Sequence, residues 1–282
     1  AWDVHETEGN EATLMAMGKG IDVPAGSMSE QPYSVFMDVY AAIARLHMKT
    51  YGSSIEDFAA VSAKNHMHSV DNKLSQYQAK YSVDEVLAAR PIAYPLTLPM
   101  CSPISDGAAA AIVCTKKGLE RLQKASADAL RIRASVIRTG TTRAPADYDR
   151  HVSRLAADEA YEESGLTPAD IDVAEVHDAT AAGEVVEVEA LRLVPAGDGG
   201  KAAARGETAI GGRIPTNPSC GLESKGHPFG ATGLGQVHEL ADQLRGRAGS
   251  RQVQGAEVGI AQNGGGIIGV EEAVSAVTIL SH

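Results

Sequence analysis

The chain has 282 residues, of which 44% are hydrophobic, so its apolar area suffices for one large α/β unit or for two domains. A net charge of −11 without a cluster of lysine and arginine argues against a nucleic-acid surface, because phosphate binding needs a basic footprint. No apolar run approaches the ~20 residues of a membrane span, and the N-terminus lacks the order of a signal peptide, so we expect a cytoplasmic protein outside the membrane.

The first hundred residues are expected to be mostly helical. Apolar residues repeat every three to four positions from Val35 to Leu46, which predicts an amphipathic helix ending near Tyr51 and Gly52. Ser53 to Glu56 has the pattern of a capping box and predicts a second helix reaching about Lys64. Residues 91–103 contain four prolines and are expected to form a structured loop.

A change of unit is predicted near residue 125. Asp106 to Cys114 is a short small-and-apolar run that suits a buried strand or a helix, and its length favours the strand. Leu130 to Val136 alternates apolar and polar residues, which predicts a half-buried strand that opens a new unit. We therefore expect one domain over residues 1–125 and a second over residues 126–282.

The second half alternates strands with helices. The expected strands are Asp172–Val176, Val258–Ala261, Ile267–Val270 and Ala273–Leu280, and the expected helices are Val152–Ala160 and Ala231–Leu244, with a capped turn at Thr167–Asp170. This order predicts a layered α/β fold, in which ligands gather where strands end.

Three short segments carry residues suited to chemistry. His227 lies between Gly226 and Pro228, where it could take a proton from a thiol or merely cap the following helix. His177 ends a predicted strand and could donate to a developing oxyanion, with Asp178 orienting it or capping the next helix, the latter being favoured. Gln262–Gly266 exposes backbone N–H groups or is a plain turn, and it lacks the spacing of known phosphate-binding loops.

Taken together, these segments resemble the thiolase superfamily, and most closely its sterol-carrier or lipid-transfer branch. The matching segments follow family order and comprise Tyr40–Tyr51, Phe58–Asn65, Tyr94–Leu98, Cys101–Ala109, His177-Asp178, Asn217–Ser219, Gly226–Pro228 and Gly264–Gly266. The resemblance implies an α/β fold with α-β-α-β-α layers, built from two similar five-stranded, mostly parallel sheets and a helical loop domain. Residues 1–103 look like that loop domain, so the first strands of the N-terminal sheet would be missing from the chain.

The resemblance also implies roles for individual residues. A nucleophilic cysteine would take the acyl group, His227 would activate it, and His177 would serve the carbonyl of a bound coenzyme A thioester. The amide of Gly264 would lie in an oxyanion hole. No permanently bound cofactor or metal is implied, since coenzyme A enters as the substrate.

Two departures from the family concern cysteine. The nucleophilic cysteine lies before the loop domain in the family, so we expect it in a missing N-terminal segment or on a complementing chain. Cys101 and Cys114 match non-catalytic positions and are expected to be buried and unreactive. The family's acid/base cysteine is replaced by Gln262 or by Ala179, neither of which exchanges a proton at neutral pH. Cys220, seven residues before His227, could supply the missing thiol or could simply pack.

The resemblance therefore implies a thiolase-like acyltransferase that cleaves or forms a carbon–carbon bond in a 3-oxoacyl-coenzyme A. One alternative is a lipid-transfer-type aldolase that cleaves a 3-hydroxyacyl-coenzyme A without a covalent intermediate, which the absent acid/base cysteine favours. Another is a non-catalytic subunit of the thiolase fold. By resemblance alone we expect a homodimer and a possible small partner protein with an OB-fold and a zinc ribbon.

Overall fold

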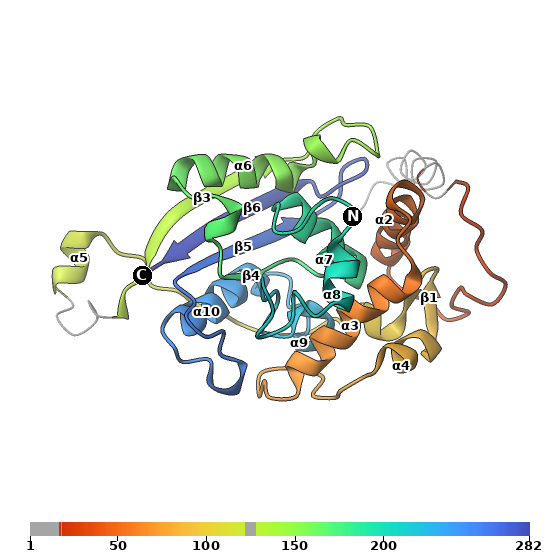
Figure 1. The fold of residues 1–282 in the computed structure, drawn as a ribbon, viewed down its shortest axis with the longest axis horizontal. Helices are drawn as coiled ribbons and strands as arrows, with labels where there is room; N and C mark the ends of the chain where they lie inside the picture. Colours follow the sequence, from red (N-terminus) through yellow and green to blue (C-terminus); the bar gives the residue numbers. More distant parts are fainter. Residues whose placement is uncertain (1–16, 18, 122–127) are drawn as a thin grey trace.

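A mixed four-stranded sheet forms the centre of the computed structural model, which describes Met17, residues 19–121 and residues 128–282 (Figure 1). Its strands lie in the order β3 (Arg131–Thr139), β6 (Val274–Ser281), β5 (Val258–Gly265) and β4 (Val173–Glu175). Only the pair of β4 and β5 is parallel. The layered α/β fold is thus confirmed, but this sheet is mixed and smaller than the mostly parallel, five-stranded sheets that the resemblance implied.

Helices cover both faces of the sheet. Ile260 and Val277 pack with α6 (Val152–Ser164) on one face, and Ala261 and Leu280 pack with Leu240 of α10 (Thr232–Leu244) on the other. Neighbours such as Ile260 and Ala261 face opposite ways because successive side chains of a strand alternate. Figure 1 shows α6 above the sheet and α10 below it.

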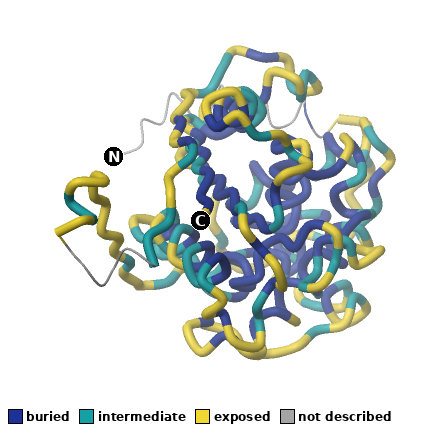
Figure 2. Tube along the Cα trace, turned by 60° about the vertical axis from the view of Figure 1, so that its left-hand side comes forward, coloured by how far each residue is buried: buried dark blue, intermediate teal, exposed yellow. Residues whose placement is uncertain are grey.

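The N-terminal helices pack beside α7 (Ala181–Ala190) and enclose a second core, which includes Phe58, Met100 and Val185. They are α2 (Val35–Tyr51), α3 (Ile55–Ser69) and α4 (Val83–Ala88), followed by β1 (Pro91–Ala93), β2 (Leu96–Thr97) and the 3-10 turn η1 (Leu98–Met100). In Figure 2 the buried residues gather in the interior, and exposed residues lie on the outer loops. The four-proline loop is therefore more regular than expected, because two of its segments pair as a hairpin.

The remaining described elements are short. They comprise α5 (Lys116–Arg121), η3 (Tyr148–Arg150), η4 (Pro168–Asp170), α8 (Gly199–Ala204), α9 (Gly221–Lys225) and η5 (Gly249–Arg251). The predicted domain boundary adjoins residues 122–127, which lie outside the described residues, so the division into two domains stays a prediction. Within the described ranges, no helix combines the length and hydropathy that a membrane span requires.

The predicted capping box is shifted by one residue. The Asp57 carboxylate accepts a hydrogen bond from the Ser54 N–H at 2.8 Å, so the helix begins at Ile55 and continues to Ser69. Ser53 cannot serve as the cap because its hydroxyl lies 2.9 Å from Nδ1 of His47. The preceding helix ends as predicted, with Gly52 in the left-handed conformation at φ 69°.

Two of the predicted strands are absent, and a third is longer than predicted. Residues 106–114 form no regular structure, because none of the described residues pairs with them, and Cys114 is exposed rather than buried. Residues 267–270 belong to a tight turn closed by a bridge between Ile268 and Glu271. β5 continues through Gly265, so the predicted glycine turn is largely strand.

Candidate functional site

The fold brings His177 and His227 together, although 50 residues of chain separate them. His177 follows β4, and His227 follows α9 through Gly226, whose φ of 103° suits glycine. Their Nε2 atoms lie 3.3 Å apart, and the two rings meet edge to face. The two histidines that the sequence placed in one site are therefore direct neighbours.

The backbone of each histidine is fixed by long-range hydrogen bonds. The N–H of His177 donates to Oε1 of Gln262 at 3.0 Å, and the N–H of Val176 donates to Oδ1 of Asn217 at 2.8 Å. The N–H of His227 lies 3.2 Å from both the carbonyl of Pro103 and the hydroxyl of Ser105. The imidazole pair is thus held by its surroundings before any ligand binds.

Thr232 determines which nitrogen of His227 carries the proton. Its hydroxyl lies 2.8 Å from Nδ1 of His227, and it donates its single hydrogen to the carbonyl of Pro228 at 3.1 Å. The hydroxyl can therefore only accept from the imidazole, so Nδ1 carries the hydrogen and Nε2 of neutral His227 has a free lone pair. His177 must then donate through its own Nε2–H.

Both histidines are neutral at pH 7. Burial, followed by the positive charge that a protonated His227 would carry, lowers the pKa of His177 to about 3. Burial also lowers the pKa of His227 to about 4, with a smaller contribution from Lys225. The pair therefore combines a base at Nε2 of His227 with a neutral donor at Nε2 of His177. Within the described part of the chain, Nδ1 of His177 is buried without a hydrogen-bond partner.

Asp178 connects the two histidine segments, and it does not cap the next helix as predicted. Oδ1 of Asp178 accepts from the N–H of Leu222 at 2.7 Å, and Oδ2 lies 3.4 Å from the N–H of Glu223 at the start of α9. Thr180 is the N-cap of α7 instead. Gly221 has φ 60°, and a Cβ there would lie 2.0 Å from Oδ2 of Asp178, so the contact requires glycine.

A buried acidic cluster surrounds this contact. Oxygen atoms of Asp178, Glu184 and Glu223 lie within 4.8 Å of one another, which is close enough to hold a metal ion. Lys64 already donates to Glu184, and Nδ2 of Asn65 lies within 3.2 Å of all three carboxylates. Burial, followed by the charge of Glu184, raises the pKa of Glu223 to about 8. Lys64 and Asn65 thus supply hydrogen bonds to this cluster, while Oε2 of Glu223 has no hydrogen-bond partner among the described residues.

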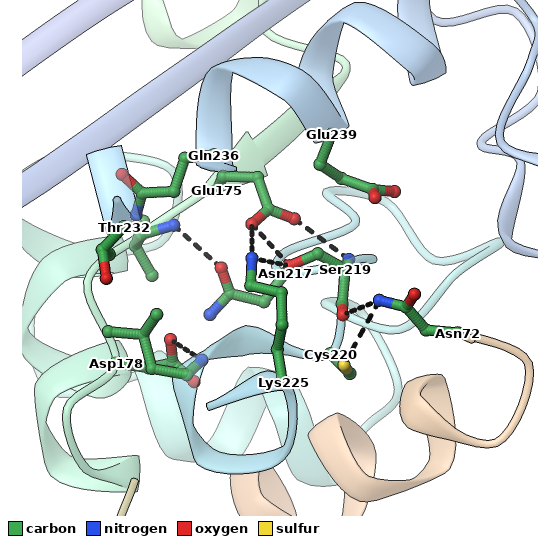
Figure 3. A network of polar contacts seen from close by, with 12 residues as sticks. Asn72, Glu175, Asp178, Asn217, Ser219, Cys220, Lys225, Thr232, Gln236 and Glu239 are labelled. Carbon is green, nitrogen blue, oxygen red and sulfur yellow. Dashed lines mark hydrogen bonds and ion pairs between the residues drawn. The ribbon is translucent and has the colours of Figure 1, made fainter. Parts of the chain in front are cut away.

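Cys220 lies beside Asn72 in the polar network that Figure 3 shows. Its thiol donates to the hydroxyl of Ser75 at 3.3 Å and accepts from Nδ2 of Asn72 at 3.7 Å. Burial raises the pKa of the thiol to about 12, so it holds its proton at neutral pH. No hydrogen bond joins it to either histidine among the described residues. Cys101 is buried as predicted.

Gln262 is a residue whose role the sequence did not reveal. Its Nε2 donates to the hydroxyls of Ser153 and Ser275, both at 3.2 Å, while its Oε1 accepts from His177. The Gln262 side-chain amide therefore holds the backbone of His177. The separation of 85 residues along the chain left no local pattern from which this contact could be predicted.

Gly264 lies inside β5, opposite Ser275 of β6. A Cβ at this position would lie 2.6 Å from Cγ of Glu272, so the side chain of Glu272 packs directly on Gly264. Only glycine permits this approach.

The chain is similar to known proteins along most of its length. The Thiolase C-terminal domain-like family matches residues 135–281. Sterol carrier protein 2 of Oryctolagus cuniculus is 43% identical over 256 residues, which make up 88% of this chain and 46% of that protein. The acetyl-CoA acetyltransferase of Methanothermobacter thermautotrophicus is 43% identical over 237 residues, covering 82% of this chain and 60% of that enzyme. The chain thus spans about half the length of the curated relatives it matches.

A solved structure shares the fold. The Ltp2-ChsH2(DUF35) aldolase aligns with a TM-score of 0.69 and 21% sequence identity, covering 92% of this chain and 69% of the other. At that identity the likeness concerns the fold alone.

Proposed function

Since this chain belongs to the thiolase superfamily, we propose that the protein acts on a 3-oxoacyl-coenzyme A and cleaves or forms the carbon–carbon bond next to the thioester. The observation that carries the proposal is the contact of 3.3 Å between Nε2 of His177 and Nε2 of His227. It supplies one neutral base and one neutral hydrogen-bond donor at the same point.

In this proposal the two imidazoles have different tasks. Nε2 of His227 takes the proton of a thiol, since its lone pair is free while Thr232 holds its Nδ1–H. Nε2–H of His177 turns from His227 to the thioester oxygen and stabilises the charge that develops there. The amide of Gly264 would complete the oxyanion hole. The nucleophilic thiol would come from a part of the protein outside this sequence.

A comparison of two substrates with the whole protein tests this proposal. A thiolase cleaves a 3-oxoacyl-coenzyme A only when free coenzyme A is present, because the second thiol accepts the acyl group. An aldolase cleaves a 3-hydroxyacyl-coenzyme A whether or not free coenzyme A is added. Product analysis by liquid chromatography in the four combinations separates the two reactions. Absence of turnover in all four, with candidate partner proteins added, would favour a non-catalytic subunit of the thiolase fold.

One observation favours the aldolase as the second candidate. Position 262 is an amide fully engaged with His177, Ser153 and Ser275, and position 179 is alanine. Neither side chain can take the proton of an incoming coenzyme A thiol. An aldolase needs no incoming thiol, because its cleavage leaves no acyl group on the enzyme. Similarity in fold to the Ltp2-ChsH2(DUF35) aldolase is compatible with this reading.

The hypothesis that Cys220 supplies the missing acid/base thiol stays a prediction. Its hydrogen bonds to Asn72 and Ser75 favour a packing role. If the thiol does exchange the proton, Cys220→Ser lowers turnover by orders of magnitude.

The assembly is likewise proposed, not observed. The structural neighbour's name pairs an aldolase with a DUF35 protein, which supports a small partner protein for this chain. A homodimer and a cytoplasmic location complete the proposal, and light scattering of the purified protein with and without a partner tests the assembly.

A further inference from the structure

The buried carboxyl groups of Glu187 and Glu272 form no ion pair with a lysine or arginine among the described residues. Glu187 of α7 is 1% exposed, and Glu272, in the turn before β6, is 7% exposed. Both carboxylate oxygens of Glu187 and Oε2 of Glu272 lack a hydrogen-bond partner among the described residues. Side-chain atoms of Glu187, Glu272 and His151 all lie within 4.8 Å of one another.

The charged and titratable groups around this pair supply no free positive charge. Arg143 donates to Oε2 of Glu271 at 2.5 Å, and this buried pair is neutral as a unit. Tyr40 of α2 stays neutral and adds no charge, because burial raises its pKa well above the usual value. His151 at the start of α6 is neutral at pH 7, because burial lowers its pKa to about 3. Two ionised carboxylates would therefore face each other without a cation.

A positive charge is needed, and a proton fits the geometry better than a metal ion. Nδ1 of His151 accepts the N–H of Ser153 at 3.3 Å, so its Nε2 carries the hydrogen and points at Oε2 of Glu272, 3.7 Å away. A metal ligand needs a free lone pair on that nitrogen. Two carboxyl groups that cannot both ionise retain one proton between them, as in other close carboxyl pairs.

The position of Glu272 connects the pair to the proposed oxyanion hole. Its Cγ packs on Gly264 so closely that no side chain fits there. Ser153, the second residue of α6, hydrogen-bonds to Gln262 and to Ser275. We propose that Glu187 and Glu272 share one proton, and that this singly protonated pair is the positioning element of the Gly264 backbone. The second part rests on the proposed function, since it assumes that Gly264 contacts substrate.

The first part predicts a specific pH dependence of folding. Burial, followed by the charge of Glu272, raises the pKa of Glu187 well above its usual value in the folded chain. Between pH ~4.3 and this raised pKa the pair then holds one proton more in the folded chain than in the unfolded chain, so its contribution to the free energy of unfolding falls as the pH rises. The equilibrium constant of unfolding gains up to about tenfold per pH unit for this proton.

Urea unfolding of this chain from pH 4 to pH 9 tests that prediction. Glu187→Gln supplies a permanent hydrogen-bond donor in place of the protonated acid. Its free energy of unfolding should therefore lack the pH dependence that the shared proton causes, and the same result is expected for Glu272→Gln. Exposed Glu163 on α6 provides the control, since Glu163→Gln should keep the wild-type slope. Coincident slopes for wild type and Glu187→Gln would overturn the shared proton. So would a stoichiometric metal ion in the purified protein whose removal by EDTA lowers the melting temperature of wild type but not of Glu187→Gln.

Turnover of the whole protein with a 3-oxoacyl-coenzyme A tests the second part. Loss of the shared proton to water at high pH separates the carboxylates and displaces Gly264, so kcat should decline on the alkaline side. In Glu187→Gln this decline should move upward by at least one pH unit, whereas Glu187→Ala, which lacks the donor, should have a lower kcat at every pH. An unmoved alkaline decline in Glu187→Gln would refute the positioning role. Absence of wild-type turnover would refute the proposed function, while the unfolding data would still decide the shared proton.

Discussion

Replacement of Thr232 by valine tests the assignment of the base to His227. Valine keeps the branched shape but removes the hydroxyl that accepts the Nδ1–H of His227 at 2.8 Å. The carbonyl of Pro228 keeps the backbone N–H of Thr232 at 3.0 Å, so the start of α10 is retained. The substitution therefore removes the partner of the imidazole and little else.

The size of the effect follows from that single contact. A buried donor left without an acceptor costs about 1–3 kcal/mol. If this cost falls on the tautomer that acts as the base, it lowers kcat about 5- to 150-fold, at 1.36 kcal/mol per factor of ten. The loss should appear in kcat more than in KM, because Thr232 is not expected to touch the substrate.

Thr232→Ser is the matched control, because it keeps the hydroxyl and should stay within a few-fold of wild type. Nitrogen-15 NMR of histidine-labelled protein reports the tautomer directly. We predict hydrogen on Nδ1 of His227 in wild type and a mixture of tautomers in Thr232→Val. A wild-type rate in Thr232→Val, or hydrogen on Nε2 of His227 in wild type, would refute the reasoning.

Three further predictions concern the fold and the pH dependence of the site. Gly221→Ala should destabilise the chain by about 3 kcal/mol or more in urea unfolding, because its Cβ would lie 2.0 Å from a carboxylate oxygen of Asp178 and its backbone is left-handed. Gly206→Ala, at φ 77° with nothing within 4 Å of the new Cβ, should cost only about 1–2 kcal/mol, and equal losses in the two variants would contradict the close contact with Asp178. Because burial lowers the pKa of His177 to about 3 and of His227 to about 4, these two histidines bind more protons in the unfolded chain below pH ~6.5, so their contribution to stability should fall on acidification. The acid limb of turnover should lie below pH 5. An acid limb of turnover near pH 6.5 would show that the histidine acting as base is solvated and not buried. Cys220→Ser should retain turnover within a few-fold if the thiol only packs, whereas a loss of orders of magnitude would establish it as the acid/base group.

Local patterns in the sequence predicted much of the fold. The apolar repeat from Val35 to Leu46 and the glycine after it gave α2 and its end, and the run entered from the glycine loop gave α10. Alternation from Leu130 to Val136 gave β3. These signals are strong because burial of one face of a helix or strand places apolar residues at a fixed spacing within that segment.

Predictions that depended on distant partners were less successful. Residues 106–114 have the composition of a strand, but a strand exists only when another segment hydrogen-bonds to it. The capping box moved from Ser53 to Ser54 because the hydroxyl of Ser53 is engaged by His47. Neither partner is visible in the local sequence.

The same distinction applies to the site. His177 and His227 were found because each has a short and characteristic setting, the end of a strand or a turn between glycine and proline. The residues that fix them were missed or misread, since Gln262 and Asp178 act across 85 and 44 residues of chain. Asp178 also has the local appearance of a helix cap, although its carboxylate is directed toward α9.

The most direct test of the histidine pair is the rate of carbon–carbon bond cleavage in the whole protein with His177→Leu and His227→Gln beside wild type. Leucine at position 177 cannot donate a hydrogen bond, and glutamine at position 227 cannot take a proton. We predict that each variant keeps the wild-type circular dichroism spectrum and loses at least about 100-fold in kcat/KM, in line with the usual contribution of an oxyanion donor or of a positioned base. Folded variants that cleave the substrate within a few-fold of the wild-type rate would contradict it.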